Sequence, residues 1–517
     1  MSYRLLIIVL SSALGIATGV TAADQAGTNK RPNIVLIMVD DMGFSDIGCY
    51  GGEIATPNID RLASEGMRFT QFYNNAKCTT TRASLLTGLY ARQARGQLLG
   101  TDMVTLGEVL QSAGYHTVLS GKWHLGHGAT THPYHRGFAE VYGLLDGCSN
   151  HFDPAQRDPA YKGGAVRYFA HNDERITSFP PDFYSTDAFT DHAIGELRDA
   201  VKRQQPVFLH LTYTAPHYPL HARPEVIAKY VGKYTTGWDA LRAARYQRQC
   251  QMGLIPDPST WALSGHDRRV KDWSAVDATG EDHRMAVYAA MIDHVDQAIG
   301  RLITALKETG QYDNTVLMFL SDNGGCTEDP GPGAKGNAGP KDDYVCVGAG
   351  WGWAANAPFC RYKSWIHEGG ISTPLIVRWP GQVQAGSYHR GVGHIIDLMP
   401  TLVEIGAATY PTTFAKQQIL PMEGHSLVPA FRGQPPTVAP LGWMWEGSRG
   451  LRDGRYKAVM AGDVKRWELY DLEADRSETH DLATEKPQVL ARLVADWKAW
   501  AERTDSLPRG KTTDQEP

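Results

Sequence analysis

Four short apolar runs end abruptly in polar or charged residues, and this pattern constrains the fold of the chain more than any other feature. The first run leads directly into Asp40 and Asp41. Continuous apolar runs of this length are typical of strands buried on both faces, as in a parallel sheet. The four runs occupy residues 34–39, 116–119, 206–211 and 316–320.

Helical patterns lie between these runs. Residues 59–66 and 106–113 are two of them, and a longer one carries apolar residues at spacings of three or four from Ala289 to Leu306. Strands that alternate with helices predict an open α/β sheet. In such sheets ligands bind beyond the carboxyl ends of the strands, so the polar residues at the run ends predict a shared site.

The C-terminal part has a different pattern. Segments 441–446, 455–460 and 466–471 predict an antiparallel meander, and a helix with an apolar stripe follows from Leu490 to Ala501. Prolines cluster before the meander and mark a boundary. We therefore expect a large α/β domain over 24–425, a small α+β subdomain over 426–503 and a flexible tail over 504–517.

Residues 1–23 have the pattern of a secretory signal peptide. Arg4 is the one charge before an apolar run over 5–20, and small residues follow at 21–23. A membrane anchor is the alternative, but the run contains serines, a glycine and a threonine and lacks a basic stop. We expect export to a periplasm or to the medium, without stable membrane insertion after cleavage. The formal net charge of −5 offers no basic surface for nucleic acid.

Oxygen ligands gather at two of the predicted strand ends. Asp40 and Asp41 follow one run, and Asp322 and Asn323 follow another. Three carboxylates and an amide suit a hard cation, Ca²⁺ or Mg²⁺, better than zinc. An adjacent Asp pair taken alone is equally typical of a helix cap, so the two pairs together carry this interpretation.

Cations and a histidine complete the candidate set. Arg82, Lys122 and Lys363 could bind an anion, because a dication added to three carboxylates and three cations leaves the site positive. His217 lies beyond the third run, where a general acid or base could act, although a structural histidine is the alternative. A further group, His124, His127, His132 and His135, has a spacing that superficially resembles a zinc site, but the surrounding glycines and proline favour a loop.

The chain has seven cysteines, so at least one stays outside intramolecular pairing, and we expect this one to be Cys78. Threonines follow Cys78 and lead into an Ala-Ser-Leu-Leu run, which indicates a helix start. A cysteine at that position is predicted to have a depressed pKa and to be reactive, with a half-buried free thiol as the alternative. Residues 324–360 form a long segment with nine glycines, which together with Trp351, Trp353 and Phe359 could wall a pocket.

These motifs together resemble the sulfatase family. Cys78-x-x-x-Arg82, followed by Ser84-Leu-Leu-Thr87-Gly88, is similar to the sulfatase signature, and 121–126 is similar to its second signature. Further similar motifs, in the same order, are 33–41, Ala215-Pro216-His217, Ser321-Asp322-Asn323-Gly324 and Lys363 before Glu368-Gly369-Gly370. The resemblance extends from about Pro32 to 469–472.

The resemblance implies an alkaline-phosphatase-like sandwich with a large mixed, mostly parallel sheet flanked by helices, plus the small C-terminal α+β domain. It implies an arylsulfatase-type sulfuric ester hydrolase that acts on a sulfated small molecule or glycan. A maturation enzyme would oxidise Cys78 to formylglycine, whose hydrate is the nucleophile. One Ca²⁺ ion would be held by Asp40, Asp41, Asp322, Asn323 and residue 78.

The resemblance also assigns roles to the remaining residues. Arg82 and Lys122 would position the nucleophile and the sulfate, and His124 would take the proton that drives release of sulfate. His217 and Lys363 would stabilise or protonate the leaving oxygen. Thr80 departs from the family pattern, which has Pro or Ala at this position, and the maturation enzyme reads that pattern.

Two alternatives remain open at this point. A phosphodiesterase or phosphonate monoester hydrolase of the same superfamily would usually carry a histidine after Asp322, and Asn323 argues against it. A protein that binds sulfated glycans without catalysis is the second alternative, if Cys78 is not converted.

Overall fold

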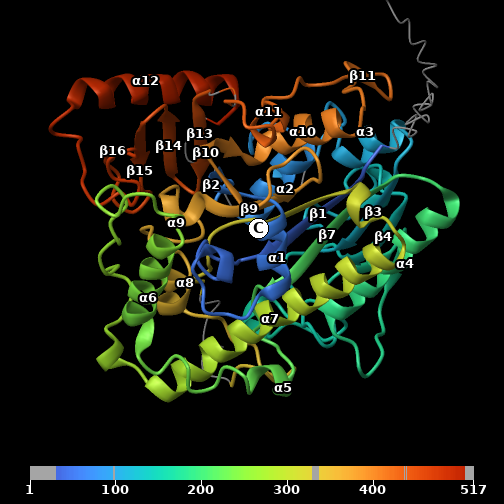
Figure 1. Cartoon of the computed structure of the whole chain (residues 1–517), viewed down its shortest axis with the longest axis horizontal. Helices are drawn as coiled ribbons and strands as arrows, with labels where there is room; N and C mark the ends of the chain where they lie inside the picture. Colours follow the sequence, from blue (N-terminus) through green and yellow to red (C-terminus); the bar gives the residue numbers. More distant parts are fainter. Residues whose placement is uncertain (1–30, 97–98, 329–336, 436, 438, 507–517) are drawn as a thin grey trace, which may run out of the picture.

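The computed structural model describes residues 31–506 apart from 97–98, 329–336, 436 and 438. Within this range the chain forms a large mixed sheet, a small antiparallel sheet and helices on both faces of the large sheet (Figure 1). The strands of the large sheet are, in spatial order, β10 (Ser387–His394), β2 (Met67–Tyr73), β9 (Ser372–Arg378), β8 (Thr315–Ser321), β1 (Asn33–Asp40), β7 (Val207–Pro216), β3 (His116–Gly121), β4 (Glu140–Leu144), β5 (Phe169–His171) and β6 (Glu174–Ile176).

The four predicted strands are neighbours at the centre of this sheet, as β8, β1, β7 and β3. They pair in parallel, with Ile37 of β1 opposite Leu211 of β7 and Phe319 of β8. Antiparallel pairs lie further out, where β9 joins β8 to β2 and where β5 follows β4. The prediction of a mixed, mostly parallel α/β sheet is therefore confirmed.

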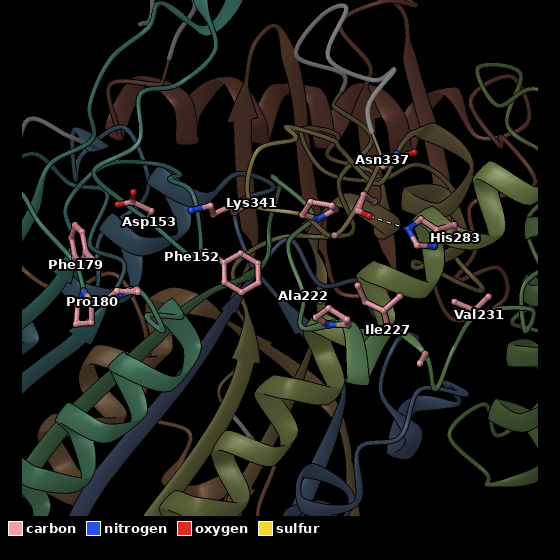
Figure 2. A pocket seen from close by; sticks show the side chains of 16 residues that line it. Phe152, Asp153, Phe179, Pro180, Ala222, Ile227, Val231, His283, Asn337 and Lys341 are labelled. Carbon is pink, nitrogen blue, oxygen red and sulfur yellow. Dashed lines mark hydrogen bonds between the residues drawn. The ribbon is translucent and has the colours of Figure 1, made fainter.

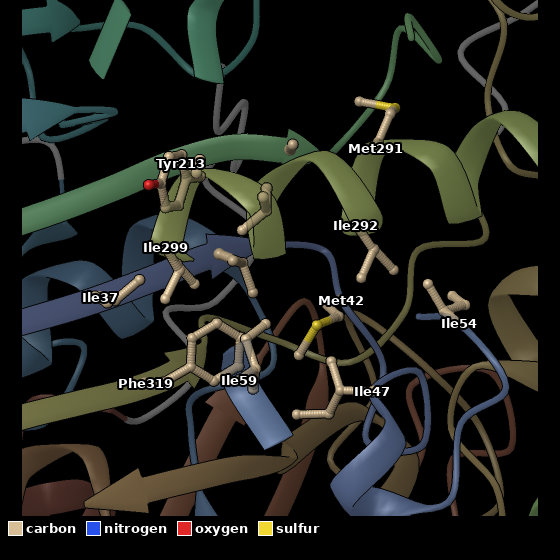
Figure 3. Packing of buried hydrophobic residues seen from close by; sticks show 14 of the residues in the cluster. Ile37, Met42, Ile47, Ile54, Ile59, Tyr213, Met291, Ile292, Ile299 and Phe319 are labelled. Carbon is tan, nitrogen blue, oxygen red and sulfur yellow. The ribbon is translucent and has the colours of Figure 1, made fainter. Parts of the chain in front are cut away.

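Alternation along β1 explains why its apolar run is continuous. Val35, Ile37 and Val39 pack into one core, and the residues between them pack into a second core on the opposite face. Figure 3 shows the first core, where Ile37 and Phe319 lie near Ile299 of helix α7 (Ala278–Glu308). A strand covered on both faces needs apolar residues at every position.

Helices cover both faces. The first core includes residues of α1 (Pro57–Glu65), α4 (Ser185–Arg203) and α7, and the second includes residues of α2 (Cys78–Thr87), α3 (Leu106–Ser112) and α10 (Leu398–Ile405). The helical segments predicted near 59–66, 106–113 and 289–306 correspond to α1, α3 and α7. The other α-helices are α5 (Pro224–Ile227), α6 (Gly237–Gln251), α8 (Ala349–Ala354), α9 (Glu368–Ile371), α11 (Val428–Phe431) and α12 (Pro487–Arg503).

The small sheet has four strands rather than the predicted three, in the order β13 (Leu441–Trp445), β14 (Ser448–Asp453), β15 (Tyr456–Met460) and β16 (Trp467–Asp471). The sequence analysis missed β14 because its residues are largely polar or charged. Helix α12 packs on this sheet, and the indole of Trp497 donates to the carbonyl of Trp443 at 3.1 Å.

Some predictions on the ends of the chain are not tested by the described residues. The signal peptide at 1–23 and residues 507–517 of the tail lie outside them. The domain boundaries at 425 and 503 stay predictions. Within the described part of the chain, the helices lack the combination of length and apolar character that a membrane span requires.

Candidate active site

The carboxyl ends of the four central strands bring most of the predicted residues together. Asp40 is the last residue of β1, Lys122 follows β3, and Asp322 follows β8. The ammonium group of Lys122 pairs with the Asp40 carboxylate. Beyond β7, His217 Nε2 lies 3.4 Å from Asp41 Oδ2. Parallel neighbours end at the same edge of a sheet, so this arrangement follows from the strand order.

Helix α2 presents Cys78 and Arg82 to this edge. Cys78 is the first residue of α2, and Arg82 lies one turn further on. The Arg82 guanidinium donates to Asp322 Oδ2 from Nε at 3.0 Å and from Nη2 at 2.7 Å. Its third nitrogen donates to the carbonyl of Lys122 at 2.9 Å. One arginine therefore links the cysteine helix to the ends of β8 and β3.

Lys363 reaches the site from the loop before α9. Its Nζ lies 2.8 Å from Asp41 Oδ1, and its side chain is 1% exposed. The next residue, Ser364, donates its backbone N–H to the carbonyl of Ala76 at 2.8 Å. The loop of Lys363 is thus hydrogen-bonded to the segment that precedes Cys78.

Several residues beside the charged groups have left-handed backbone conformations. Asp41, Ala76, His124 and Ser364 have φ values of 68°, 61°, 61° and 72°. Such values are unfavourable for residues with a side chain and concentrate at functional sites. Here they occur next to Asp40, Lys77 and Lys363, so local strain accompanies the placement of the charges.

Burial and charge act against each other on the acidic groups. Burial alone would raise the pKa of Asp41, but the charges of His217 and Lys363 outweigh it and hold the pKa well below its usual range. For Asp322, burial and the neighbouring Asp40 outweigh Arg82 and raise the pKa to about 6. Three carboxylates thus compete in one buried place, which a cation would relieve.

The basic groups show the complementary effects. Burial would lower the pKa of Lys122, but Asp40, Cys78 and Asp322 together outweigh burial and raise it. For His217, burial outweighs the effect of Asp41 and lowers the pKa to about 3. The Nδ1 atom of His217 lies 2.7 Å from the carbonyl oxygen of Tyr218.

The prediction of an acidic, reactive thiol at Cys78 was wrong. Burial raises the pKa of Cys78, and the nearby charges of Lys122 and Lys363 do not overcome it. Its position at the start of α2 agrees with the sequence pattern, but the side chain is only 2% exposed. The thiol itself is a poor nucleophile in this environment.

The four histidines with zinc-like spacing do not form a metal site. His124 lies among the charged groups, and burial together with Lys122 and Arg82 lowers its pKa. His127 instead stacks on Tyr168, with ring centroids 4.5 Å apart. Among the described residues, the one group of three or more His, Cys, Asp or Glu side chains close enough to share an ion is Asp40, Asp41 and His217.

Two oxygens at the site fit a hard cation. Asp40 Oδ1 and Asn323 Oδ1 are buried without a hydrogen-bond partner among the described residues. Asn323 Nδ2 donates to Asp41 Oδ1 at 2.7 Å, which directs the amide oxygen away from that carboxylate. Buried polar atoms are rarely left unpaired, so these oxygens are natural ligands for an ion. Asp41 and Asp322 lie beside them, as the sequence predicted.

Two residues at the site were missed by the sequence analysis. The hydroxyl of Tyr288 donates to the carbonyl of Asp41 at 3.2 Å, and Glu328 Oε2 lies 3.4 Å from Lys363 Nζ. Tyr288 precedes the helical pattern predicted from Ala289 and lies on helix α7, and only its position in the fold gives it this role. Glu328 lies in the glycine-rich segment, where no residue pattern distinguishes it.

A cavity of about 820 Å³ lies apart from these groups (Figure 2). Its lining is mainly apolar and includes Phe152, Phe179 and Ile227. Residues 337–341 of the glycine-rich segment contribute to its wall, whereas Trp351 and Trp353 of that segment pack in the first core. No predicted site residue lines this cavity, so the charged chemistry lies elsewhere.

The fold and the site define a class of α/β proteins in which buried carboxylates and cations surround a residue at a helix start. Comparison with known proteins identifies the family. A family model described as Sulfatase matches residues 32–406, and a model described as N-sulphoglucosamine sulphohydrolase, C-terminal, matches residues 360–499. The chain belongs to the sulfatase family, whose members hydrolyse sulfate esters.

Similar proteins cover nearly the whole chain. An uncharacterized sulfatase of Schizosaccharomyces pombe is 33% identical across 93% of this chain and 96% of its own. An arylsulfatase of Klebsiella aerogenes is 35% identical across 80% of this chain and 94% of its own. The solved structure of i-CgsB with k-i-k-neocarrahexaose is 27% identical, with a TM-score of 0.70, and covers 92% of this chain and 94% of that one.

Proposed function

We propose that this sulfatase is calcium-dependent and uses a formylglycine made from Cys78. The observation that carries the proposal is the arrangement of three cations and three carboxylates around one buried cysteine. The cysteine thiol is held protonated by burial, so its direct use as a nucleophile is disfavoured. The hydrate of a formylglycine would instead supply a nucleophilic oxygen at the same position.

The proposed ion would be held by Asp40, Asp41, Asp322 and Asn323, together with residue 78. All four side chains are buried and offer oxygen atoms, and two of those atoms lack a partner among the described residues. His217 lies close to Asp40 and Asp41, at the edge of this ligand set. A bound Ca²⁺ ion would polarise the sulfate oxygens and offset their negative charge.

Arg82 and Lys122 would position the sulfate and residue 78. Both are almost completely buried and fixed by Asp322 and Asp40, so their charges need no reorganisation when an anion arrives. Preorganised charge of this kind stabilises the charge that develops on the sulfate oxygens in the transition state. His124, which lies among the same cations, would accept a proton from residue 78.

His217 and Lys363 would assist the leaving alcohol oxygen. Both contact Asp41, from β7 and from the loop before α9, so they approach the site from the same side. Lys363 keeps its proton because Asp41, together with Cys326 and Glu328, outweighs the effect of burial and raises its pKa. It can therefore donate a hydrogen bond to an oxygen that acquires negative charge.

The substrate and the cellular setting belong to the same proposal. The similar proteins include an arylsulfatase and a protein crystallised with k-i-k-neocarrahexaose, which supports a sulfated small molecule or a glycan as the substrate class. We also propose that the protein is exported to a periplasm or to the medium, and that its maturation enzyme acts on Cys78 before folding. The first 23 residues support the export part of the proposal.

The proposal is tested by peptide mass analysis of residue 78 together with activity on an aryl sulfate and on sugar sulfates. We expect formylglycine in protein from the native host, loss of activity on chelation and recovery with Ca²⁺. Stoichiometric zinc with no calcium in elemental analysis would contradict the metal assignment. Full activity with an unmodified thiol at residue 78 would reject the mechanism, and faster turnover of a phosphonate monoester would favour the rival hydrolase.

A further inference from the structure

Glu328 connects the buried catalytic groups to the exposed side of the site. Its Oε2 lies 3.4 Å from Lys363 Nζ, and the two side chains are 31% and 1% exposed. Its other oxygen pairs with Lys77, the residue before Cys78, whose side chain is 21% exposed. Burial would raise the pKa of Glu328, but Lys363 and Lys77 outweigh it and hold the pKa at about 2. A charged carboxylate therefore lies directly beside the lysine proposed to assist the leaving oxygen.

Tyr218 lies next to Glu328 and extends the same set outward. Its hydroxyl donates to Glu328 Oε2 at 3.3 Å, and its ring centroid is 4.2 Å from that of His217. The half-buried Lys162 donates to the Tyr218 hydroxyl at 3.3 Å. The ring of Tyr344 is 6.0 Å from that of Tyr218. Glu328, Tyr218 and Lys162 thus form one hydrogen-bonded set beside the two proposed leaving-group residues.

The outer members of this set are the exposed ones, whereas Tyr218 between them is only 8% exposed. Lys363 and His217 are almost completely buried, Glu328 is about one-third exposed, and Tyr161, whose ring is 6.3 Å from that of Tyr344, is 39% exposed. If Arg82 and Lys122 hold the sulfate, its alcohol part would extend toward these residues, where the site approaches solvent. The side chains of this set are the ones that an alcohol leaving group would meet.

The chemistry of these side chains distinguishes leaving groups. A carboxylate accepts hydrogen bonds, an ammonium group donates them, and phenols do both while presenting a flat ring. A sugar ring has hydroxyls that can bond the carboxylate and the ammonium group, and it has an apolar face that can stack on the phenol ring. A plain aryl ring can stack on the phenol ring but offers no hydrogen-bond donor to Glu328. It would therefore leave Glu328 desolvated without a new partner.

We propose that Lys77, Glu328, Tyr218 and Lys162 form a leaving-group subsite that selects a sulfated sugar over a simple aryl sulfate. The inference rests on the proposed function, because it takes His217 and Lys363 as the residues that assist the leaving oxygen. Lys77 balances the charge of Glu328. The subsite therefore suits the hydroxyls of a sugar, with Lys162 available to a further polar group.

The test compares hexose monosulfates, sulfated at each of their positions, with 4-nitrophenyl sulfate, on formylglycine-containing enzyme. The best sugar sulfate should exceed the aryl ester in kcat/KM. Glu328→Gln should lower kcat/KM about 30-fold for that sugar, mainly through KM, and about threefold for the aryl ester. Tyr218→Phe, which keeps the ring, should shift the ratio of the two substrates in the same direction by a few-fold.

Glu174→Gln is the matched control, because Glu174 is exposed on the edge strand β6 and should leave the substrate ratio unchanged. Thermal melts of each variant separate altered recognition from altered folding. Equal losses of Glu328→Gln on both substrates would overturn the inference and assign Glu328 to the support of Lys363. Preference for the aryl ester over every sugar sulfate would also overturn it. Failure to hydrolyse any sulfate ester, sugar or aryl, would instead reject the proposed function itself.

Discussion

The short segment from Lys363 to Glu368 connects two clusters of buried charge. The catalytic cluster contains Asp40, Asp41, Asp322, Arg82, Lys122 and Lys363. The boundary cluster contains Glu368, Lys457, Arg476 and Glu478 and joins α9 to the small C-terminal sheet. Only five positions separate Lys363 from Glu368 in the sequence, so one short loop contributes to both.

The boundary cluster is internally matched. Lys457 Nζ lies 2.9 Å from Glu368 Oε1 and 2.8 Å from Glu478 Oε1, and Arg476 Nε lies 2.6 Å from Glu368 Oε2. Burial would raise the pKa of Glu368, but Lys457 and Arg476 outweigh it and hold the pKa well below its usual range. Each charge there stabilises its neighbours.

The charged groups of the catalytic cluster are paired less completely. Asp322 has a raised pKa of about 6 in spite of its two hydrogen bonds from Arg82, and Asp40 Oδ1 lacks a partner among the described residues. Each cluster contains as many positive as negative groups, yet the boundary cluster is fully paired and the catalytic cluster is not. The difference indicates that the catalytic cluster is arranged for a ligand rather than for the stability of the fold.

The largest expected effect separates the two clusters by activity. Asp322→Asn keeps the shape of the side chain but removes one of three carboxylates from the proposed ion. We expect turnover to fall about 1,000-fold and calcium occupancy to be lost, with little change in melting temperature when both proteins are compared free of calcium. Steady-state kinetics, elemental analysis and a thermal melt check this. A large drop in melting temperature with calcium retained would contradict the comparison.

The corresponding change in the boundary cluster is Glu368→Gln, with Lys498→Met on the exposed side of α12 as a control for general surface effects. The Glu368→Gln substitution leaves Lys457 and Arg476 without their shared charged partner. We expect the free energy of unfolding to fall by about 3 kcal/mol at pH 7, with turnover of the folded protein much less affected. Urea denaturation and kinetics on the folded enzyme measure the two effects.

The loss of unfolding free energy caused by Glu368→Gln should become smaller as the pH falls. A carboxyl whose native pKa is depressed contributes stability above its unfolded pKa, here near the ordinary value of 4.5, and this stability is lost as the pH falls toward the native value. The difference between wild type and Glu368→Gln should therefore shrink between pH 7 and pH 3. A difference that grew on acidification would show that Glu368 is not stabilised by its partners.

A smaller effect tests which side of the catalytic cluster faces the alcohol. His217→Ala should lower kcat about 100-fold for a sugar sulfate and about tenfold for an activated aryl sulfate, because the aryl oxygen needs little help to leave. Parallel kinetics on both esters give the ratio. Equal losses on both substrates would place His217 in sulfate or ion binding instead.

The smallest effect concerns Thr80, the third residue of α2. Its hydroxyl donates to the carbonyls of Asn75 and Lys77 at 3.0 and 2.8 Å, and the first backbone bond of the helix is made by the next residue, Thr81. Thr80→Pro removes these two hydroxyl bonds but no backbone bond of the helix, so it should lower stability by about 1–2 kcal/mol. It should raise formylglycine content and activity together in a host whose maturation enzyme requires Pro.

Peptide mass analysis of residue 78, compared with Thr79→Ala as a control, measures the conversion. High conversion in the unaltered protein would show that Thr80 does not hinder the maturation enzyme. The catalytic cluster itself should keep its geometry in either case, because Thr80 does not contact it through any hydrogen bond found in the described residues.

The sequence predicted those parts of the molecule that leave a local pattern. The central strands were predictable because burial on both faces requires continuous apolar runs, and the polar residues at their ends could be placed at one edge. The boundary cluster left no such pattern, since Glu368 bonds Lys457 and Arg476 across 89 and 108 residues. The acidity of Cys78 was wrongly predicted because the helix start is visible in the sequence, whereas the burial that raises the pKa is not.

The burial of Cys78 has a consequence for the order of events during synthesis. Residues 82 and 322, which meet in the finished site, are 240 positions apart. At a synthesis rate of roughly 5–20 residues per second, that interval takes on the order of ten to fifty seconds. During it, the segment around Cys78 has no β8 to close over it. A modifying enzyme that needs an extended peptide would have this interval in which to act, and the topology of the sheet sets its length.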